Sequence, residues 1–400
     1  MKIPSAPRPR TAAMTWPEVH ARRLERHALA APAAGAAPAD IAAAMAGVHA
    51  QVLSAAELGI ALRIDGATRT DVRHALWTDR SLVKTYGPRG TVHLLATRDL
   101  PMWTAALSAV PVAPSTQPDD IRLTPAQTEE VVAAIADALL DAELTIDELS
   151  AAVVARTGPW AGDLVMPAFQ TYWPRWRQAM HLAGMRGALC FAPNRGRKVT
   201  YTNPHRHLTT TTPAAAPGAR PAAPEPEAAL AELLGAYLNA YGPATPRAFA
   251  HWLNTPVTWA ADLFASQGDR LTPVDVEGTT AWVAAGDIRA PAEPPSGVRL
   301  LPYFDTYAYR VGNLPPDRLA TPEAAPAMKA NHQLLLVDGL VAGRWHQQRT
   351  GRNLALTVAP ATPLSRHHLE SLESQATRLG EILEATPTLT LGQVTTGGHA

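Results

Sequence analysis

TPAQTEEVVAAIADALLDAELTIDELSAAVV, residues 124–154, contains the start signals of two consecutive helices. Thr124 is followed by a proline and then by Gln127, and Thr145 is followed three residues later by Glu148, which is the spacing of a capping box at a helix N-terminus. Apolar residues recur between these signals at helical spacing: Val131, Val132, Ile135, Leu139 and Leu140. The stretch therefore predicts a long helix from about residue 125 and a shorter helix from about residue 146.

The residues that follow complete a compact unit. We expect a third helix through Phe169, Trp173 and Trp176. After it comes ALCFAPNRGRKVTYTN, residues 188–203, in which two β-rich runs surround an Asn/Gly turn and predict a hairpin. Three helices followed by a hairpin are typical of a winged helix, whose second and third helices form the helix-turn-helix pair used on DNA.

The same order of elements is predicted twice more along the chain. In the first unit we expect helices from about residue 39, from Ser54, and from Thr70 through Val83, followed by a strand in RGTVHLLA. In the third unit the helix EAALAELLGAYLNAYG precedes two shorter helices and the strand GTTAWVAA. The repeat shows in the pattern of elements and not in residue identity.

We therefore predict an α+β, mainly α, fold that contains three tandem winged-helix units and a small C-terminal β-rich domain with a basic hairpin and a terminal helix. The segment between the second and third units is rich in Thr, Ala, Pro and Gly, which predicts a linker. The N-terminus is predicted to be disordered, with either Met1 or Met14 as the true start. The predicted boundaries are 1–15 for the disordered N-terminus, 16–110, 120–204 and 226–296 for the three winged helices, 205–225 for the linker and 297–400 for the β-rich domain.

Composition limits the class of protein. The 400 residues, 46% of them hydrophobic, are enough for several packed cores. No apolar run is long enough to cross a membrane, and Cys190 is the single cysteine, so we expect a protein of the reducing cytoplasm without an internal disulfide. The 35 basic and 35 acidic side chains cancel, which argues against coating nucleic acid by bulk charge and leaves room for a local basic groove.

GVHAQVLSAAELGIALR, residues 47–63, places two polar side chains ahead of an apolar run. Ser54 with Glu57 three residues later predicts a helix that starts after Ser54, so HAQVL is an extended approach. Residues two apart point to the same side of an extended chain, and they diverge by about 200° on a helix. His49 and Gln51 are therefore predicted to act as a pair. A purely structural role, in which both polar groups satisfy the backbone at a helix corner, stays open.

The chain resembles the AlkZ/YcaQ group of bacterial DNA glycosylases, a winged-helix family that excises bulky or crosslinked alkylated purines. The stretches that carry the resemblance run in order from about residue 16 to about residue 390: GVHAQVLSAAELGIALR, YGPRGTVHLLATRDLPMW, AYLNAYGPATPRAFAHW, LLPYFDTYAYR and LLVDGLVAGRWHQQRTGRNLALTV. The catalytic signature of the family is a glutamine, an aliphatic residue and a second glutamine. It corresponds here to His49-Ala50-Gln51, so the second glutamine matches and a histidine replaces the first.

The resemblance implies hydrolysis of the N-glycosidic bond of a purine alkylated at N7 or N3, without a cofactor. Such a base is cationic and leaves without being protonated, while the sugar approaches an oxocarbenium ion. The protein must then hold a water under C1′, which two hydrogen-bonding side chains on one face are able to do. A neutral histidine also accepts a proton from that water, so we expect His49 to orient or deprotonate the water and Gln51 to fix it.

The LPYFDTYAYR stretch offers further candidates. The resemblance places Asp305 in a Phe-Asp motif of the family, where it acts either through the catalytic pair or as a purely structural residue. Tyr307 and Tyr309 alternate along a possible strand, so each is either a core residue or part of a groove lining.

Basic residues concentrate in two predicted hairpins and around the recognition helix of the first unit. Arginine beside a glycine turn suits contact with phosphate or insertion into a minor groove, and glutamines there are able to read or wedge base edges. A solvated loop is the alternative for any single arginine. The resemblance also implies an open channel for bulky lesions, and no aromatic residues that would form a cage near His49 are evident in the sequence. The predicted DNA contacts are Arg69, Arg73, Arg80, Arg195, Arg197, Lys198, Arg344, His346, Gln347, Arg349 and Arg352, with Gln348 beside them.

No metal site and no nucleotide cofactor are predicted. The histidine pairs in NPHRH and at residues 367–368 lack cysteine partners and HExxH spacing, and no glycine-rich phosphate loop follows a strand. We expect a monomeric, cytoplasmic DNA glycosylase that acts on double-stranded DNA with alkylated bases, in repair or in self-resistance to a DNA-alkylating natural product. The alternatives are a winged-helix DNA-binding regulator without enzymatic activity and a protein-interaction scaffold.

Overall fold

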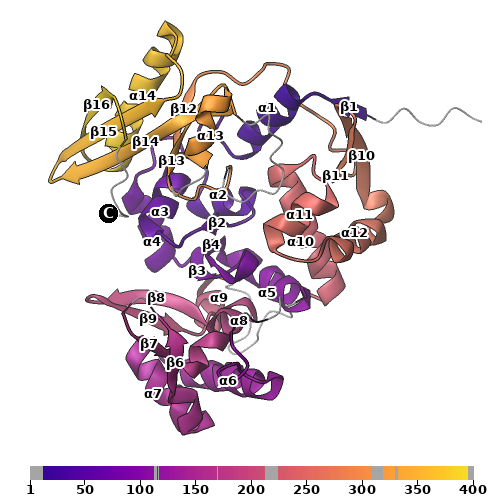
Figure 1. Cartoon of the computed structure of the whole chain (residues 1–400), viewed down its shortest axis with the longest axis vertical. Helices are drawn as coiled ribbons and strands as arrows, with labels where there is room; N and C mark the ends of the chain where they lie inside the picture. The colour runs from indigo at the N-terminus through magenta and orange to yellow at the C-terminus, as the bar shows by residue number, and fades with distance from the viewer. Residues whose placement is uncertain are drawn as a thin grey trace, which may run out of the picture.

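The protein is described from a computed structural model, which covers residues 12–111, 115, 117–168, 170–211, 224–308, 319–328 and 332–394. The first predicted unit lies in the middle of the molecule (Figure 1). The other parts surround it, with the second unit at the bottom of the view, the third at the right and the C-terminal sheet at the upper left. Segments far apart in the sequence therefore meet on the first unit.

The first unit combines short helices with a small sheet of order β2-β4-β3. The predicted third helix ends earlier than expected, at Trp77, and Val83 lies in β3. The run Leu82–Tyr86 is rich in β-branched and aromatic residues, which favours a strand. Strand β2 was not predicted. The elements are α1 (Trp16–Arg26), α2 (Pro38–Ala44), β2 (Val48–His49), α3 (Leu53–Ala61), α4 (Arg69–Trp77), β3 (Leu82–Tyr86), β4 (Val92–Ala96) and α5 (Leu100–Ala109).

In the second unit both predicted capping boxes are present, at Thr124 and at Thr145. The predicted third helix is partly wrong, because Trp173 lies in a strand and only Trp176 lies in a helical turn. Prolines within this stretch interrupt helical hydrogen bonding. Phe169 lies outside the described residues. The elements are α6 (Pro125–Leu139), β5 (Leu144–Thr145), α7 (Ile146–Thr157), β6 (Leu164–Pro167), β7 (Tyr172–Pro174), α8 (Met180–Met185), β8 (Cys190–Arg195), β9 (Lys198–Thr202) and α9 (His205–Thr211).

Helix α9 occupies the start of the predicted linker, so the linker prediction is wrong for residues 205–211. Asn203 explains the start of this helix, because its side-chain oxygen accepts a hydrogen bond from the backbone N–H of His205 at 3.1 Å. Residues 212–223 of the predicted linker lie outside the described residues.

The third unit includes residues 12–14, which sequence patterns did not suggest. Strand β1 (Ala12–Met14) pairs in parallel with β10, so residues 12–14 are not disordered as predicted. The side chain of Met14 is buried between Val274 and Val276 of β10 in one apolar cluster, which explains the pairing. The other elements are α10 (Pro226–Tyr241), α11 (Pro246–Leu253), α12 (Val257–Ser266), β10 (Leu271–Val276) and β11 (Thr279–Ala284).

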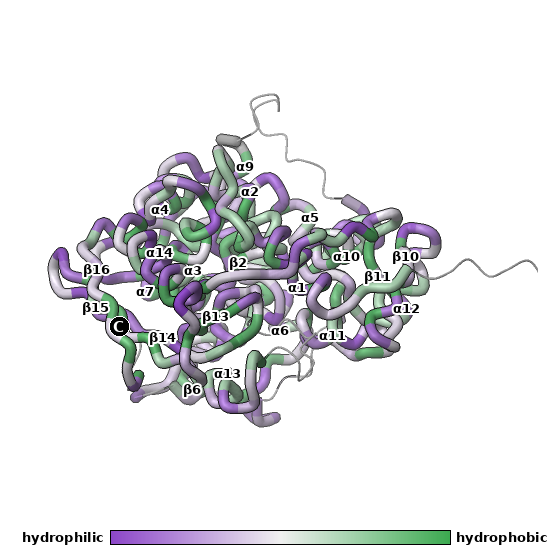
Figure 2. Tube along the Cα trace, turned by 90° about the horizontal axis from the view of Figure 1, so that it is seen from above, coloured by the Kyte–Doolittle hydropathy of each residue, from purple (hydrophilic) through white to green (hydrophobic). Residues whose placement is uncertain are grey.

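The C-terminal part forms a five-stranded sheet of order β12-β13-β14-β15-β16. Strands β14 and β15 make the long hairpin that carries RWHQQRTGR. In Figure 2 the chain at the left edge of the view, beside the labels β15 and β16, is hydrophilic. The elements are β12 (Val298–Leu301), α13 (Ala325–Met328), β13 (Gln333–Val337), β14 (Leu340–Thr350), β15 (Asn353–Pro360), α14 (Arg366–Ile382) and β16 (Thr386–Leu391).

The buried core crosses the predicted domain boundaries. One apolar cluster runs from Met45 in the first unit through Leu139 in the second to Trp345 in the C-terminal sheet. A second cluster joins Trp103 of α5 to Tyr237 of α10. The predicted units therefore share cores and do not pack as separate globules. The assignment of a winged helix to each unit stays a prediction.

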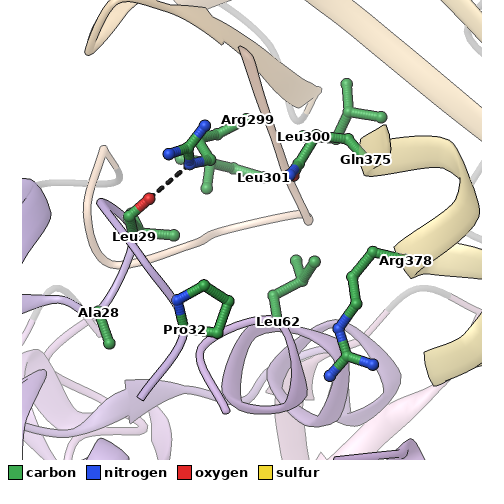
Figure 3. Close-up of a pocket in the computed structure, with 9 residues that line it drawn as sticks. All are labelled: Ala28, Leu29, Pro32, Leu62, Arg299, Leu300, Leu301, Gln375 and Arg378. Carbon is green, nitrogen blue, oxygen red and sulfur yellow. Dashed lines mark hydrogen bonds between the residues drawn. The ribbon is translucent and has the colours of Figure 1, made fainter. Parts of the chain in front are cut away.

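A small pocket of about 130 Å³ lies where α14 and β12 meet the first unit (Figure 3). Its two arginines already donate hydrogen bonds to backbone carbonyls. Arg378 donates to the carbonyl oxygens of Ala61 at 3.2 Å and of Ile64 at 2.8 Å, at the C-terminal end of α3, and Arg299 donates to the carbonyl of Leu29. A cation at the end of a helix satisfies carbonyls that lack a helical partner. This pocket is a structural junction and we do not treat it as a functional site.

Candidate active site

His49 lies in strand β2, directly opposite His93 of β4. The backbone N–H of Ala50 donates to the carbonyl of Val92 at 2.7 Å and continues the pairing beyond the strand. His49 is extended as predicted, and its side chain is buried, with 5% of the residue exposed. Residues directly opposite each other on antiparallel strands place their side chains on the same face of the sheet.

Gln51 lies at a bend between β2 and α3 and is exposed. The predicted helix start after Ser54 is wrong by about two residues, because α3 begins at Leu53 with Val52 as its N-cap. Glu57 does not close a capping box there, since its buried carboxylate pairs with two arginines of the next helix. The structure therefore brings His49 and Gln51 to one corner, one buried and one exposed, and their joint action on one water stays a prediction.

His93 is the direct neighbour of His49. The two rings are 5.4 Å apart between centroids and nearly perpendicular, at 85°. The Nδ1 atom of His93 lies 2.9 Å from the carbonyl oxygen of Thr91, so Nδ1 carries a proton and donates it to that carbonyl. Gly87 makes room for this ring, because a Cβ at that position would lie 2.9 Å from its Cγ atom.

His93 stays neutral in this environment. Burial is the main cause that holds the pKa of His93 well below its usual range, and the positive charge of Arg89 adds to it. No signal in the sequence identified His93 beforehand, because it reads as one polar residue in the strand Val92–Ala96.

Phe304 also contacts His49. Its ring lies 5.2 Å from that of His49, between centroids, with an interplanar angle of 58°. The rings of His93 and Phe304 therefore both contact His49, and the expectation that no aromatic cage forms there stays a prediction. The contact with Phe304 was not indicated by sequence patterns, because Phe304 lies more than 250 residues away in the sequence and arrives from the loop after β12.

Asp305 forms a buried ion pair with Arg63 of the loop after α3. The two guanidinium nitrogens donate to the two carboxylate oxygens at 2.8 Å each, and the side chains of Arg63 and Asp305 are 0% and 2% exposed. Arg63 also donates to the carbonyl of Gly59 at 2.7 Å. A bidentate pair of this kind fixes both position and orientation. It connects the C-terminal part of the chain to the unit that carries His49.

Tyr307 lies in the core. It is buried in an apolar cluster with Leu24 and Leu29, and its ring is edge-on to that of His27. Its backbone N–H donates to Asp305 at 3.0 Å. These contacts favour the core alternative for Tyr307. Tyr309 lies outside the described residues.

Two of the three basic residues predicted around α4 are engaged by an acidic partner. Arg69 and Arg73 both pair with the carboxylate of Glu57, whose side chain is 2% exposed, and the Nε of Arg73 lies 3.0 Å from it. Arg80 has a left-handed backbone conformation with φ of 57°, and its carbonyl accepts a hydrogen bond from the hydroxyl of Thr97 at 2.6 Å. Arg73 keeps about half of its side chain exposed, so it remains the more accessible cation of the two ion-paired arginines.

The β8–β9 hairpin presents its three predicted cations at an exposed turn. Arg195 pairs with Glu148, and the Nζ atom of Lys198 lies 2.9 Å from the carboxylate of Asp147. Arg197 at the tip is exposed, and no ion pair joins it to any residue that the structure describes. The acidic first turn of α7 therefore neutralises part of the charge of this hairpin.

The β14–β15 hairpin separates its predicted DNA contacts onto two faces. Side chains alternate along a strand, so Arg344 and His346 share one face while Trp345 and Gln347 share the other. Trp345 is buried and donates from its indole N–H to the carbonyl of Leu301 at 2.8 Å, which identifies its face as the one packed on the core. At the tip, Arg349, Gln348 and Arg352 are exposed. The tip is therefore more exposed than the middle of the hairpin, where Arg344, His346 and Gln347 are half-buried.

Family comparison agrees with this geometry. A family model described as DNA glycosylase AlkZ-like matches residues 42–382. The chain belongs to the AlkZ-like DNA glycosylase family. It is 32% identical over 390 residues to an interstrand DNA cross-link repair glycosylase of Streptomyces sahachiroi, over 90% of this chain and 95% of that protein. It is also similar to the solved structure of the Streptomyces sahachiroi DNA glycosylase AlkZ, with a TM-score of 0.75, 30% identity, and coverage of 95% of this chain and 100% of that one.

Membership of this family confirms the resemblance and the prediction of a DNA glycosylase. In the glycosylase, the matched region contains both His49 and the Phe304–Asp305 turn. Within the described ranges, no helix is long and apolar enough to span a membrane, and no three His, Cys, Asp or Glu side chains gather as a metal site requires. His49, Gln51 and Asp305 were candidates from the sequence, and their roles stay predictions. His93, Phe304 and Arg63, which contact His49 or Asp305, were not among those candidates.

Proposed function

We propose that this glycosylase hydrolyses the N-glycosidic bond of bulky or crosslinked purines alkylated at N7 or N3 in double-stranded DNA. The observation that carries the proposal is the placement of His49 on β2, two residues before the exposed bend that begins at Gln51. The curated relative named for cross-link repair supports the substrate class. The biological role we propose is DNA repair or self-resistance to a genotoxic natural product, carried out by a monomer in the cytoplasm.

Cleavage of this bond needs few catalytic groups from the protein. An alkylated purine leaves as a neutral base because it already carries a positive charge, so no general acid is needed for the leaving group. The sugar gains oxocarbenium character as the bond breaks. A neutral imidazole accepts a proton from the attacking water, and an amide accepts or donates a hydrogen bond without changing its charge. In our proposal His49 activates the water and Gln51 holds it.

The neighbours of His49 suit this assignment. His93 is neutral and keeps its Nδ1 proton on a backbone carbonyl, so it does not compete for the proton that His49 takes up. His49 is buried, and in our proposal this burial limits the access of bulk water to the imidazole.

We propose that the exposed cations contact the DNA backbone. The exposed tip of the β14–β15 hairpin, with Arg349 and Arg352, is suited to phosphate or to a minor groove, and Arg73 and Arg197 add cations elsewhere on the surface. Because the net charge of the chain is zero, these local cations supply the salt-dependent part of binding. DNA phosphate would contact three further cations only by displacing their carboxylate partners: Arg69, Arg195 and Lys198. Arg344, His346 and Gln347 lie farther down the hairpin and would contact DNA only when the tip is inserted.

The experiment is base release from defined duplexes. The protein is incubated with duplexes that carry a simple N7-methyl, a bulky N7 or a crosslinked purine adduct, and the free base is measured by chromatography. We expect release from the bulky or crosslinked adducts and its loss in His49→Ala and in Gln51→Ala. His251→Ala, at an exposed position of α11, is the matched control and is expected to retain activity. Full activity of His49→Ala contradicts the assigned role, and sequence-specific binding without release from any adduct favours the regulator.

A further inference from the structure

We propose that Phe304 is a positioning residue of the active site, which holds the imidazole of His49 in its reactive orientation. The inference rests on the proposed function, in which His49 activates the water. It goes beyond that function because it assigns a role to the loop after β12, which comes from the other end of the chain.

The backbone of Phe304 is strained. Its φ angle is 57°, in the left-handed region that residues with a bulky side chain rarely adopt. Such conformations persist only where the surroundings impose them, and they cluster at functional sites. Glycine or asparagine would occupy this position without the same strain. A phenylalanine there indicates that its ring serves a purpose that outweighs the unfavourable backbone.

The surroundings that impose this conformation lie on the C-terminal side of Phe304. Asp305 is locked by Arg63 through two hydrogen bonds of 2.8 Å, and the same carboxylate accepts the backbone N–H of Tyr307 at 3.0 Å. Gly59 of α3 permits the close approach of the turn, because a Cβ there would lie 3.3 Å from Asp305 and 3.6 Å from Pro302. The turn is therefore pressed against α3 and fixed at a buried ion pair.

The ring that this turn delivers is half-buried and reaches His49, with 5.2 Å between ring centroids. His93 contacts His49 at 5.4 Å, so the imidazole is bounded by two rings that approach it at different angles. Rotation of the imidazole about its side-chain bonds would bring it against one of the two. Without the ring of Phe304, His49 loses one of these two contacts and its imidazole rotates more freely. In our proposal its orientation matters when it accepts a proton from the attacking water.

Three variants of Phe304 separate this role from a structural one. Phe304→Leu removes the flat ring and keeps an apolar side chain, Phe304→Tyr keeps the ring, and Phe304→Gly removes the ring and relieves the strained φ angle. We expect single-turnover base release to fall on the order of 100-fold in the Leu and Gly variants and to remain within about threefold in the Tyr variant. The Gly variant should melt no lower than the wild type, which a role in packing alone does not predict. Tyr303→Leu, in the same turn, is the matched control.

A second measurement does not depend on catalysis. In DNA-free protein labelled at histidine, the three-bond couplings across the Cα–Cβ bond of His49 should report one side-chain rotamer in the wild type and in Phe304→Tyr, and an average over rotamers in Phe304→Leu. If the wild type releases no base from any adduct, the proposed function is wrong, and these couplings still decide whether Phe304 holds His49. Release from Phe304→Leu at the wild-type rate, or His49 couplings that stay those of one rotamer in that variant, overturns the proposal.

Discussion

The buried pair of Arg63 and Asp305 should contribute to stability in a way that depends strongly on which partner is removed. Both side chains are almost inaccessible, at 0% and 2% exposed, so solvent does not weaken their interaction. Removing one partner of such a pair leaves an uncompensated buried charge and typically costs about 3–5 kcal/mol. The structure allows us to order the variants within that range.

Asp305→Asn retains a carbonyl oxygen that accepts from Arg63 and from the backbone of Tyr307, so we expect a loss near the lower end, about 3 kcal/mol. Arg63→Met leaves the carboxylate with only the backbone N–H of Tyr307, and we expect a loss near the upper end, about 5 kcal/mol. The double variant Arg63→Met with Asp305→Leu removes both charges and should recover at least half of the larger loss, because apolar replacements of a buried ion pair are often neutral.

The assay is urea unfolding followed by tryptophan fluorescence, with the change in free energy taken from the midpoint at a common slope. Glu370→Gln breaks an exposed pair with Arg366 on α14 and serves as the control, for which we expect no measurable change. Losses below about 1 kcal/mol in both single variants, or a double variant whose loss equals their sum, would refute the reasoning from burial.

Two further predictions concern pH and salt. Burial keeps the pKa of folded His93 well below that of the unfolded chain, so its contribution to stability is complete above pH 6.5 and is lost as the pH falls toward the folded pKa, by about 1.4 kcal/mol per pH unit. Urea midpoints measured between pH 7.5 and pH 5 should fall less steeply in His93→Gln, and an unchanged slope would contradict the assignment. For the hairpin tip, Arg349→Gln and Arg352→Gln should each weaken binding to undamaged duplex and reduce the salt slope of log K by about 1. A salt slope equal to that of the wild type in either variant would contradict a phosphate contact at that arginine.

The sequence predicted local structure well wherever the signal was local. The caps at Thr124 and Thr145 depend on side chains three residues apart, and both are present. The start of α3 was misplaced because Glu57 serves Arg69 and Arg73 in the folded protein instead of the capping box that its spacing suggested. Local spacing does not reveal that a carboxylate has better partners in the next helix, since those contacts form only after the chain turns.

The candidate site shows the same limit more sharply. His49 and Gln51 were visible as polar residues in an apolar stretch, but the groups that define the environment of His49 come from other strands and from the far end of the chain. Strand β2 has only two residues and exists because it pairs with β4. A strand of that length has too few residues to show a periodic pattern, so pairing with β4, and with it the approach of His93, was not predictable.

The distribution of charge also has a consequence for how the enzyme meets DNA. Arg69, Arg195 and Lys198 already have carboxylate partners, so DNA gains little from them unless those pairs break. Cations without such partners, including Arg352 at the hairpin tip, attract phosphate at no such cost. A protein of zero net charge therefore concentrates its attraction for DNA at a few exposed positions, which favours modest, salt-sensitive binding along undamaged duplex. In our proposal, discrimination between damaged and intact DNA then falls to His49 and Gln51, which would face the cationic base and its sugar.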